Sequence, residues 1–516
     1  MCFEVEADLR FSRISKQDVS QELLAECAEL FSAHYGTWSH DHPNSLLRGK
    51  PIQLSAERIR TYLTQDGWIA IARGADGELR GYAIAAWMKY RGTTTISWVT
   101  QLVVHTEHRR RSIGFRLLTS IWGFSDHFAW GIASASPYAI RTLEKATRRL
   151  CLPQEIQKHE AARIKALDTI EYLRGKKVRV SKEQSIIDTE FCQDLAGIAK
   201  LLEHDKQPWM LGDLPACHEW LGMTFRSQRQ STWSQSDFLS FIGSSSEIAA
   251  QAYDRMSIAD PESRHPWASP ERAEQEIAFL VDRMKLALGA RVLDFGCGSG
   301  RHCFALAQRG FEVVGVDRSK VALSRASKKA SNLQGVKPRF VDNESLKNER
   351  RFDAGLCLFD VIGSYPNDRS NADLLDEFIS NVRPGGAIAL SVMSFDFIEA
   401  KAKYVSNGNA ESLIANLPPS KIMESSGEVF DPDALIVDKK LRIVIRKEQF
   451  DHGANLPEEI MVADRRYTFA DLRELCEPRF AVDTIGYVRA GKFHLIDEAA
   501  FEPLKEILVI GRKRLV

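Results

Sequence analysis

One segment constrains the fold of this chain more than any other: residues 290–318, with the sequence ARVLDFGCGSGRHCFALAQRGFEVVGVDR. The apolar run Arg291 to Phe295, which includes Asp294, predicts a buried strand. Three glycines follow it at alternate positions: Gly296, Gly298 and Gly300. They allow a tight turn and a close approach of the backbone to a ligand. A helical stretch then leads to a second apolar run, Glu312 to Val316. Asp317 follows this run, about 20 residues after the first glycine. A carboxylate at that position accepts hydrogen bonds from ribose hydroxyls.

The spacing of the glycines separates two kinds of nucleotide site. A dinucleotide fingerprint reads G-x-G-x-x-G and presents a helix N-terminus to a pyrophosphate, whereas this turn reads D-x-G-x-G-x-G. The pattern resembles the first motif of class I S-adenosylmethionine-dependent methyltransferases. That resemblance implies that the three glycines border the methionine part of the cofactor. It also implies that Asp294 faces the cofactor's ammonium group and that Asp317 holds its ribose.

Three further strands follow in the order that the resemblance implies. Lys337 to Val341 predicts a third strand, and Asp342 after it stands where the family commonly has an acid or amide beside the adenine amino group. A helix over Ala372 to Val382 leads into RPGGAIALSVMS, which is similar to the family's turn and fifth strand.

The fourth predicted strand, Phe352 to Phe359, ends beside the expected reaction site. Phe359 is expected to contact the cofactor, and Asp360 and Tyr365 in the loop IGSYPND are expected to lie near the transferred methyl group as catalytic residues. No N-P-P-Y signature of nucleobase methylation is present, because the loop reads FDVIGSY.

Composition limits the class of protein. The 516 residues contain 69 basic and 69 acidic side chains, so no overall charge favours nucleic acid or an anionic membrane. The N-terminus lacks the pattern of a secretory signal, and no apolar run is long enough to span a membrane. Nine cysteines without paired spacing indicate reduced thiols in a cytoplasmic protein, and no metal site is expected.

Tryptophan usage divides the chain, because nine of the ten precede residue 234. A serine-rich stretch over residues 231–251 has the composition of a connector. We therefore predict three parts: an N-terminal domain over residues 1–180, an aromatic-rich extension and linker over 181–245, and the methyltransferase over 246–516.

The first domain has a strand, a basic turn and an amphipathic helix over residues 96–118, ISWVTQLVVHTEHRRRSIGFRLL. This segment resembles the acetyl-CoA loop of the GNAT acetyltransferase superfamily, R/Q-x-x-G-x-G/A, although Arg116 replaces the last small residue. The resemblance implies that acetyl-CoA is bound by residues of the strand, turn and helix: Val103, Arg111, Ser112, Gly114 and Phe115.

The acetyltransferase chemistry has alternatives. Gln101 stands where many relatives carry a glutamate base, and Leu143 stands where the superfamily often has a tyrosine acid. A non-catalytic domain that recruits substrate or senses cofactor is therefore a second interpretation. A third makes the run Arg109 to Arg111 a nucleic-acid contact. If the domain does catalyse acetyl transfer, the candidates for the missing base and acid are Tyr138, Glu144, His105 and Glu107.

Two further segments bear on the acceptor of the methyl group. Tyr253 and Asp254 precede the first methyltransferase helix and are lid candidates. After the fifth strand, two β-rich runs within residues 439–469 predict an antiparallel arm with Arg465 and Arg466 at its end. In one interpretation these arginines bind an anionic acceptor. In the other, the segment is the entry to a helix with Thr468 as its N-cap.

The sequence thus predicts an α/β protein. An N-terminal GNAT-like mixed sheet with helices is followed by a Rossmann-like, doubly wound, seven-stranded methyltransferase sheet with a β-rich insertion. The expected function is methyl transfer from S-adenosylmethionine, fused to acetyl transfer, on a small amine-bearing metabolite, natural product or peptide. The alternatives are a tRNA or translation-factor modifying enzyme, and a methyltransferase with a non-catalytic GNAT domain. Oligomeric state is left open.

Overall fold

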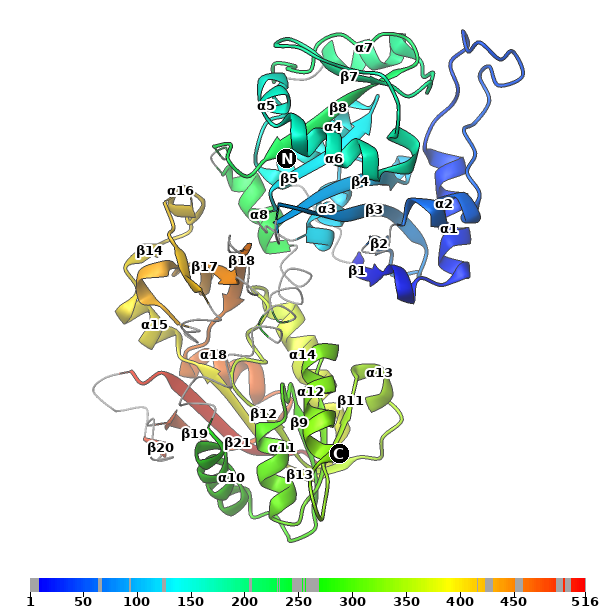
Figure 1. The fold of residues 1–516 in the computed structure, drawn as a ribbon. Helices are drawn as coiled ribbons and strands as arrows, with labels where there is room; N and C mark the ends of the chain where they lie inside the picture. The colour runs from blue at the N-terminus through cyan, green and yellow to red at the C-terminus, as the bar shows by residue number, and fades with distance from the viewer. Residues whose placement is uncertain are drawn as a thin grey trace. The chain divides into compact units, whose positions relative to one another are not determined.

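The chain divides into two compact units in a computed structural model, with the division between residues 232 and 233. The structure describes residues 9–63, 67–91, 94–122, 127–203, 207–229, 231, 233–243, 253, 256, 269–414, 416–422, 430–450, 458–488, 495–496 and 503–515. The predicted boundary at residue 245 and the lid candidate Asp254 lie outside these residues. Figure 1 shows a β-sheet with flanking helices in each unit.

The first unit contains one mixed sheet of eight strands, in the order β1-β2-β3-β4-β5-β8-β7-β6. Its strands are β1 (Arg10–Ser15), β2 (Trp68–Arg73), β3 (Leu79–Tyr90), β4 (Thr94–Val104), β5 (Ala129–Ser134), β6 (Val178–Val180), β7 (Ser185–Asp188) and β8 (His218–Phe225). Its helices include α1 (Gln21–His34), α2 (Ala56–Tyr62), α3 (Ile113–Trp122), α4 (Pro137–Thr147), α5 (Pro153–Lys158), α6 (Glu160–Thr169) and α7 (Leu195–Glu203). The predicted 181–245 extension therefore contributes two strands, β7 and β8, to this sheet.

Strand β4 changes its partners along its length. Antiparallel pairing with β3 is interrupted near Thr100, because Val99 lies opposite Ala85 and Gln101 lies opposite Ile84. Parallel pairing with β5 runs from Ile96 to Val99 and then stops. Helix α3 makes the crossover between these two parallel strands, as such a pair requires.

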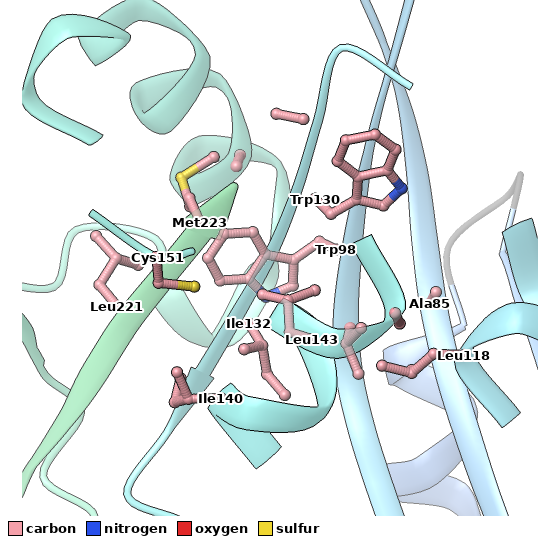
Figure 2. Packing of buried hydrophobic residues seen from close by; sticks show 14 of the residues in the cluster. Ala85, Trp98, Leu118, Trp130, Ile132, Ile140, Leu143, Cys151, Leu221 and Met223 are labelled. Atoms are coloured by element: carbon pink, nitrogen blue, oxygen red, sulfur yellow. The ribbon is translucent and has the colours of Figure 1, made fainter. Parts of the chain in front are cut away.

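The core of the first unit is rich in tryptophan. Trp98 lies among Ile132, Leu143 and Met223 in Figure 2, and all four are buried. Gly131 on β5 leaves room for this indole, since a Cβ there would lie 2.3 Å from Trp98 Cε3. The alternating apolar residues of β4 and β5 are what form this core.

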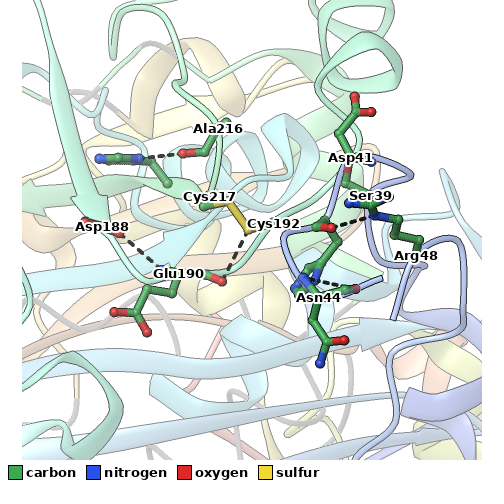
Figure 3. The surroundings of a disulfide bond; sticks show 11 residues. Ser39, Asp41, Asn44, Arg48, Asp188, Glu190, Cys192, Ala216 and Cys217 are labelled. Atoms are coloured by element: carbon green, nitrogen blue, oxygen red, sulfur yellow. Dashed lines mark hydrogen bonds between the residues drawn. A yellow bond between two sulfur atoms is a disulfide. The ribbon is translucent and has the colours of Figure 1, made fainter. Parts of the chain in front are cut away.

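Cys192 and Cys217 form a disulfide bond, shown in Figure 3. The prediction of reduced thiols throughout was wrong for this pair. The antiparallel pairing of β7 with β8 places Asp188 opposite His218, and this brings the chain on both sides of the pair together. Sequence spacing carries no sign of such a contact, because it depends on long-range strand pairing.

The sheet of the second unit has the strand order β11-β10-β9-β12-β13-β21-β19-β20. Its strands are β9 (Arg291–Phe295), β10 (Glu312–Val316), β11 (Arg339–Val341), β12 (Phe352–Cys357), β13 (Val382–Met393), β19 (Phe480–Val488), β20 (Leu495–Ile496) and β21 (Glu506–Lys513). The first five strands are parallel and β21 is antiparallel to β13. Seven strands were predicted, and the two-residue β20 at the edge makes eight.

Helices connect the parallel strands of this sheet. The connecting helices include α11 (Arg301–Gln308), α12 (Lys320–Ser331), α13 (Asn343–Leu346) and α14 (Asp368–Asn381). Helix α8 (Gln235–Gly243) lies at the start of the unit, α10 (Pro270–Met284) precedes β9, and α18 (Phe469–Cys476) precedes β19. The carboxyl ends of β9, β10 and β12 consequently share one edge of the sheet, where open α/β sheets bind their ligands.

A second sheet of five strands lies in the insertion after β13. It comprises β14 (Tyr404–Ser406), β15 (Pro419–Ile422), β16 (Leu435–Asp438), β17 (Ile443–Phe450) and β18 (Glu458–Arg465), with the helices α15 (Phe395–Lys401) and α16 (Glu411–Ile414). The two β-rich runs predicted to pair are β17 and β18, which do pair. Thr468 caps α18 and exchanges hydrogen bonds with Asp471 in a capping box, which confirms it as the N-cap.

Of the residues described, none belongs to a helix long and apolar enough to cross a membrane.

Candidate functional site

The glycine turn after β9 has a backbone that only glycine tolerates. Gly296 and Gly300 have φ angles of +80° and +86°. A Cβ on Gly296 would lie 2.3 Å from Cγ2 of Val361, and one on Gly300 would lie 2.7 Å from Cζ of Phe340. Close packing and left-handed backbone therefore both require glycine at these positions.

A cavity of about 230 Å³ opens at this turn. Five of the predicted cofactor-binding residues line it: Asp294, Gly296, Gly298, Asp317 and Phe359. Residues that the prediction did not include also line it, among them Met256, Arg301, His302, Asn343 and Ser364. The lid candidate Tyr253 is part of the same lining.

Asp317 connects the end of β10 to the glycine turn. Its Oδ2 accepts a hydrogen bond from the backbone N–H of Gly298 at 2.9 Å, and its Oδ1 accepts one from the N–H of Ser319 at 2.8 Å. Each carboxylate oxygen has two acceptor sites, so the group retains acceptor capacity toward the cavity.

Asp294 lies in the floor of the cavity at the end of β9, with 2% of its surface exposed. Burial raises the pKa of this carboxyl, and the positive field of His302 and a hydrogen bond from Cys303 partly offset the rise. The Cys303 thiol donates to Oδ2 of Asp294 at 3.2 Å. A cation placed in the cavity would favour the ionised form of Asp294.

A buried ionic cluster that sequence reasoning missed supports the same wall. Glu276 on α10 is fully buried and accepts hydrogen bonds from His302 Nε2 and Arg301 at 2.7 Å each, and from Arg272 at 2.8 Å. Burial acts to raise the pKa of Glu276, but the hydrogen bond and charge of His302 outweigh it and the pKa is lowered. The sequence signal for this cluster was the presence of two basic residues, Arg301 and His302, directly after the last glycine of the turn.

Gly300 and Asp342 are not among the residues that line the cavity. Gly300 starts α11 as its N-cap. Asp342 caps α13, since its side chain accepts a hydrogen bond from the N–H of Ser345 at 2.8 Å. The next residue, Asn343, is the one that lines the cavity.

The two predicted catalytic residues follow β12. Asp360 and its neighbour Phe359 both have left-handed backbone, with φ of +64° and +59°. Oδ1 of Asp360 accepts a hydrogen bond from the N–H of Met393 at 2.5 Å and lies 3.6 Å from the Arg466 guanidinium. Tyr365 is buried, and its carbonyl accepts hydrogen bonds from the N–H of Arg465 and the side chain of Asn371.

Charged residues of the insertion lie next to these two. Arg466 and Asp464 form an ion pair at 3.0 Å, and Arg446 is paired with Asp464 and Glu448. Nε of Arg466 is buried and has no hydrogen-bond partner. Tyr253 of the cavity wall is within electrostatic reach of this cluster. Burial raises the pKa of its phenol; Asp464 and Asp360 add to the rise, and Arg466 and Arg446 oppose it.

A second carboxyl group missed by sequence reasoning lies at the same edge of the sheet. Glu506 begins β21 opposite Met393. Burial raises its pKa to about 7, while a hydrogen bond from Ser391 opposes the rise.

The residues predicted to bind acetyl-CoA lie together in the first unit. Val103 is buried near the end of β4, and the turn after it brings Arg111 and Ser112 to the start of α3. Ser112 has left-handed backbone with φ of +61°. Gly114 and Phe115 belong to the first turn of α3, where a Cβ on Gly114 would make ordinary contact with Thr142 at 3.4 Å.

Other candidates of the first unit have structural roles. Leu143 is part of the core. Glu144 is buried, pairs with Arg141 at 2.7 Å and accepts a hydrogen bond from the N–H of Cys151 at 2.8 Å. His218 and Glu219 lie on strand β8. Among the residues that the structure describes, no group of three His, Cys, Asp or Glu side chains is arranged to hold a metal ion.

Comparisons with known proteins concern the second unit. Residues 292–386 match the family model described as "Methyltransferase domain". The glycine/sarcosine N-methyltransferase of Halorhodospira halochloris is 31% identical over 133 residues, which cover 25% of this chain and 48% of that protein. The ubiquinone biosynthesis O-methyltransferase of Alkalilimnicola ehrlichii is 36% identical over 109 residues, covering 20% of this chain and 42% of that protein.

Among solved structures, an S-adenosylmethionine-dependent methyltransferase from Clostridium acetobutylicum is 16% identical, with a TM-score of 0.35, and the match covers 47% of this chain and 92% of that one. The chain spans about half the length of the curated relatives named above.

The second unit therefore contains a class I S-adenosylmethionine-dependent methyltransferase domain. The family match lies wholly within this unit, and the acetyltransferase fold of the first unit stays a prediction.

Proposed function

We propose that the second unit transfers a methyl group from S-adenosylmethionine to a small acceptor that carries an amine, either a metabolite, a natural product or a peptide. The observation that carries the proposal is the cavity at the carboxyl ends of β9 and β10, where Asp317 is hydrogen-bonded to the glycine turn. The acidic side chains and the glycine backbone of this cavity support the proposal, because a ribose and an ammonium group need hydrogen-bond acceptors and a backbone that allows close approach.

Each end of the cofactor has matching residues in this proposal. Asp317 accepts hydrogen bonds from the ribose hydroxyls with its remaining lone pairs. Asp294 attracts the ammonium group, and Asn343 offers an amide on the adenine side. Gly296 keeps Val361 in place, because any side chain there would displace it.

The sulfonium of the cofactor supplies an activated methyl group, so the protein's task is to align the acceptor and exclude water. Asp360 is held in place by the Met393 amide and lies beside Arg466. Together with Asp464 it gives the acceptor side carboxylates that attract an ammonium group and take its proton. The half-buried Tyr253 limits the contact of this side with water.

The relatives favour both nitrogen and oxygen acceptors, since one is named as an N-methyltransferase and the other as an O-methyltransferase. We choose an amine because the charged cluster at Asp360 has more carboxylates than arginines: Asp360, Asp464 and Glu448 against Arg446 and Arg466. The test is to incubate the full chain with methyl-labelled S-adenosylmethionine and paired small amines and alcohols of equal size. Labelling of amines alone supports the proposal, and labelling of alcohols alone contradicts it.

A second candidate function concerns acetyl-CoA in the first unit. It is supported by β4, which stops pairing with β5 after Val99, and by the turn that leads into the N-terminus of α3. Backbone amides and the dipole of a helix N-terminus attract a pyrophosphate. Titration of the full chain with acetyl-CoA tests this. Gly114→Glu should abolish binding, whereas the control Gly114→Ala should retain it because its Cβ makes ordinary contact.

Titrations of the full chain with S-adenosylmethionine and with tRNA separate the remaining alternatives. Binding of S-adenosylmethionine without acetyl-CoA supports a non-catalytic first unit that recruits substrate. Strongly salt-dependent binding of tRNA supports a tRNA-modifying enzyme instead.

A further inference from the structure

We propose that Glu219 is the charge partner and proton acceptor of an organic ammonium group bound in the first unit. The binding site itself is independent of methyl transfer. Its use in acetyl transfer rests on the second candidate function proposed above.

Glu219 is a buried carboxyl group without a counter-charge. It lies on β8 opposite Ile187 of β7, and only 6% of its surface is exposed. In the described part of the chain no basic side chain contributes to its pKa, and the backbone of Ala135 hydrogen-bonds to it. A carboxylate buried without a cation is unfavourable unless a ligand supplies the missing charge.

Two tyrosine side chains from separate elements are close enough to this carboxyl group to feel its charge. Tyr35, at the end of α1, and Tyr172 are both within electrostatic reach of Glu219, which raises the pKa of each phenol in addition to the effect of burial. The rings of Tyr172 and Tyr62 meet edge to face at 5.6 Å, and the Trp98 indole N–H donates to the Tyr172 hydroxyl at 3.4 Å. Aromatic faces beside a carboxylate are the surroundings that bind an organic cation.

The position of Glu219 in the sheet points to a site rather than to packing alone. Ser134, the last residue of β5, pairs with Trp220, so Glu219 lies just beyond the end of that strand. On the other side of β5, strand β4 continues past Val99 without pairing to β5. There Gln101 accepts a hydrogen bond from the Tyr82 hydroxyl at 3.1 Å. Polar groups thus flank the end of β5 from both neighbouring strands.

Glu219 also has a pKa suited to proton transfer. Burial raises its pKa to about 7, and the backbone of Ala135 limits the rise. Among its neighbours, the phenols of Tyr35 and Tyr172 stay neutral at this pH because burial raises their pKa values further. In the proposed step an ammonium N–H bond breaks, its electron pair stays on nitrogen, and the proton forms an O–H bond on Glu219.

Competing groups nearby are less suited to this task. The side chain of Gln101 is a neutral amide, which does not accept a proton near neutral pH. Glu144, the other buried glutamate of the unit, is already neutralised by Arg141 at 2.7 Å. Glu219 is therefore the carboxyl group that an incoming ammonium ion would satisfy.

The test is calorimetric titration of the full chain with n-butylammonium, without any coenzyme, and with n-butanol as the neutral probe of equal size. We expect affinity for the ammonium ion to rise about tenfold between about pH 6 and about pH 8, because Glu219 becomes ionised over that range. Glu219→Gln should bind the ion about tenfold more weakly at high pH and without pH dependence. Glu144→Gln, the matched control, should keep the pH dependence.

Equal affinity of Glu219→Gln and the wild type at high pH would overturn the proposal, as would equal affinity for butanol and the ammonium ion. Infrared spectra of Glu506→Gln give an independent measurement in case the Glu219 variant does not fold, since Glu506 of the second unit also has a pKa of about 7 and would otherwise contribute the same signal. They should show a buried protonated carboxyl group that is lost as the pH rises through 7, and its absence would reject the proposal. Because no coenzyme is present, these results do not depend on whether acetyl-CoA binds.

Discussion

The carboxylate of Asp317 accepts a hydrogen bond from the backbone N–H of Gly298 at 2.9 Å. This contact holds the end of β10 against the glycine turn that follows β9, so the Asp317 carboxylate and the backbone of that turn are positioned together. Asp317→Ala should weaken S-adenosylmethionine binding by about 10- to 100-fold, because hydrogen bonds to a charged group contribute about 1.5–3 kcal/mol. Calorimetric titration measures this.

Asp376→Ala is the control for that experiment, since Asp376 is exposed and pairs with Arg479 away from the cavity lining. Its affinity should equal that of the wild type. Unchanged affinity in Asp317→Ala would show that the ribose is held elsewhere.

Gly296→Ala should lower the free energy of unfolding by about 2–4 kcal/mol and abolish cofactor binding, since it combines left-handed backbone with a clash in a packed region. The clash is with Val361, whose Cγ2 would lie 2.3 Å from the new Cβ. Differential scanning calorimetry with and without S-adenosylmethionine measures both effects.

Gly335→Ala isolates the backbone contribution. Gly335 has φ of +86° and a Cβ there would meet nothing within 4 Å. This variant should lose only about 1 kcal/mol and keep its affinity for the cofactor. Equal destabilisation of the two variants would show that contact with Val361 is unimportant.

The pH dependence of cofactor binding should reflect Asp294. Burial raises the pKa of this carboxyl, so it takes up a proton at a higher pH than an exposed aspartate does. Protonation removes its attraction for an ammonium group, and affinity for S-adenosylmethionine should therefore fall as the pH is lowered through the mildly acidic range. Titrations at a series of pH values check this, and Asp294→Asn should bind weakly with little pH dependence. A wild-type affinity that rises on acidification would contradict it.

The disulfide between Cys192 and Cys217 should stabilise the first unit. Replacing both residues by serine should lower the free energy of unfolding by about 2–4 kcal/mol. Eight of the ten tryptophans precede residue 232, so denaturation followed by tryptophan fluorescence reports mainly on this unit. Reduction of the wild type should cause a similar loss and leave the double variant unchanged. Equal stability of the oxidised wild type and the double variant would show that the bond adds nothing.

Local patterns predicted the strands of the cofactor half well. Arg291–Phe295 and Glu312–Val316 begin and end where the apolar runs do, because buried parallel strands consist of continuous apolar residues. The glycine turn and Asp317 were predictable for the same reason, since all their determinants lie within a single βαβ segment.

Features that depend on distant residues were not predictable. Glu276 lies 26 residues from His302 in the sequence, and only the packing of α10 on α11 joins them. The burial of Glu219 depends on the pairing of β8 with β7 and β5, which no local sequence pattern reveals. Asp342 had the expected position in sequence, but local hydrogen bonding to Ser345 makes it a helix cap.

The insertion after β13 begins and ends at one place. Ser394 and Tyr467 form an isolated parallel bridge, and the N–H of Phe395 donates to the carbonyl of Tyr467 at 3.0 Å. A segment with adjacent ends is exchangeable, because a different segment closes the same short gap at a similar entropic cost. Acceptor specificity can therefore diverge by replacement of the segment between these two residues, while the strands that form the cofactor site keep their length and order.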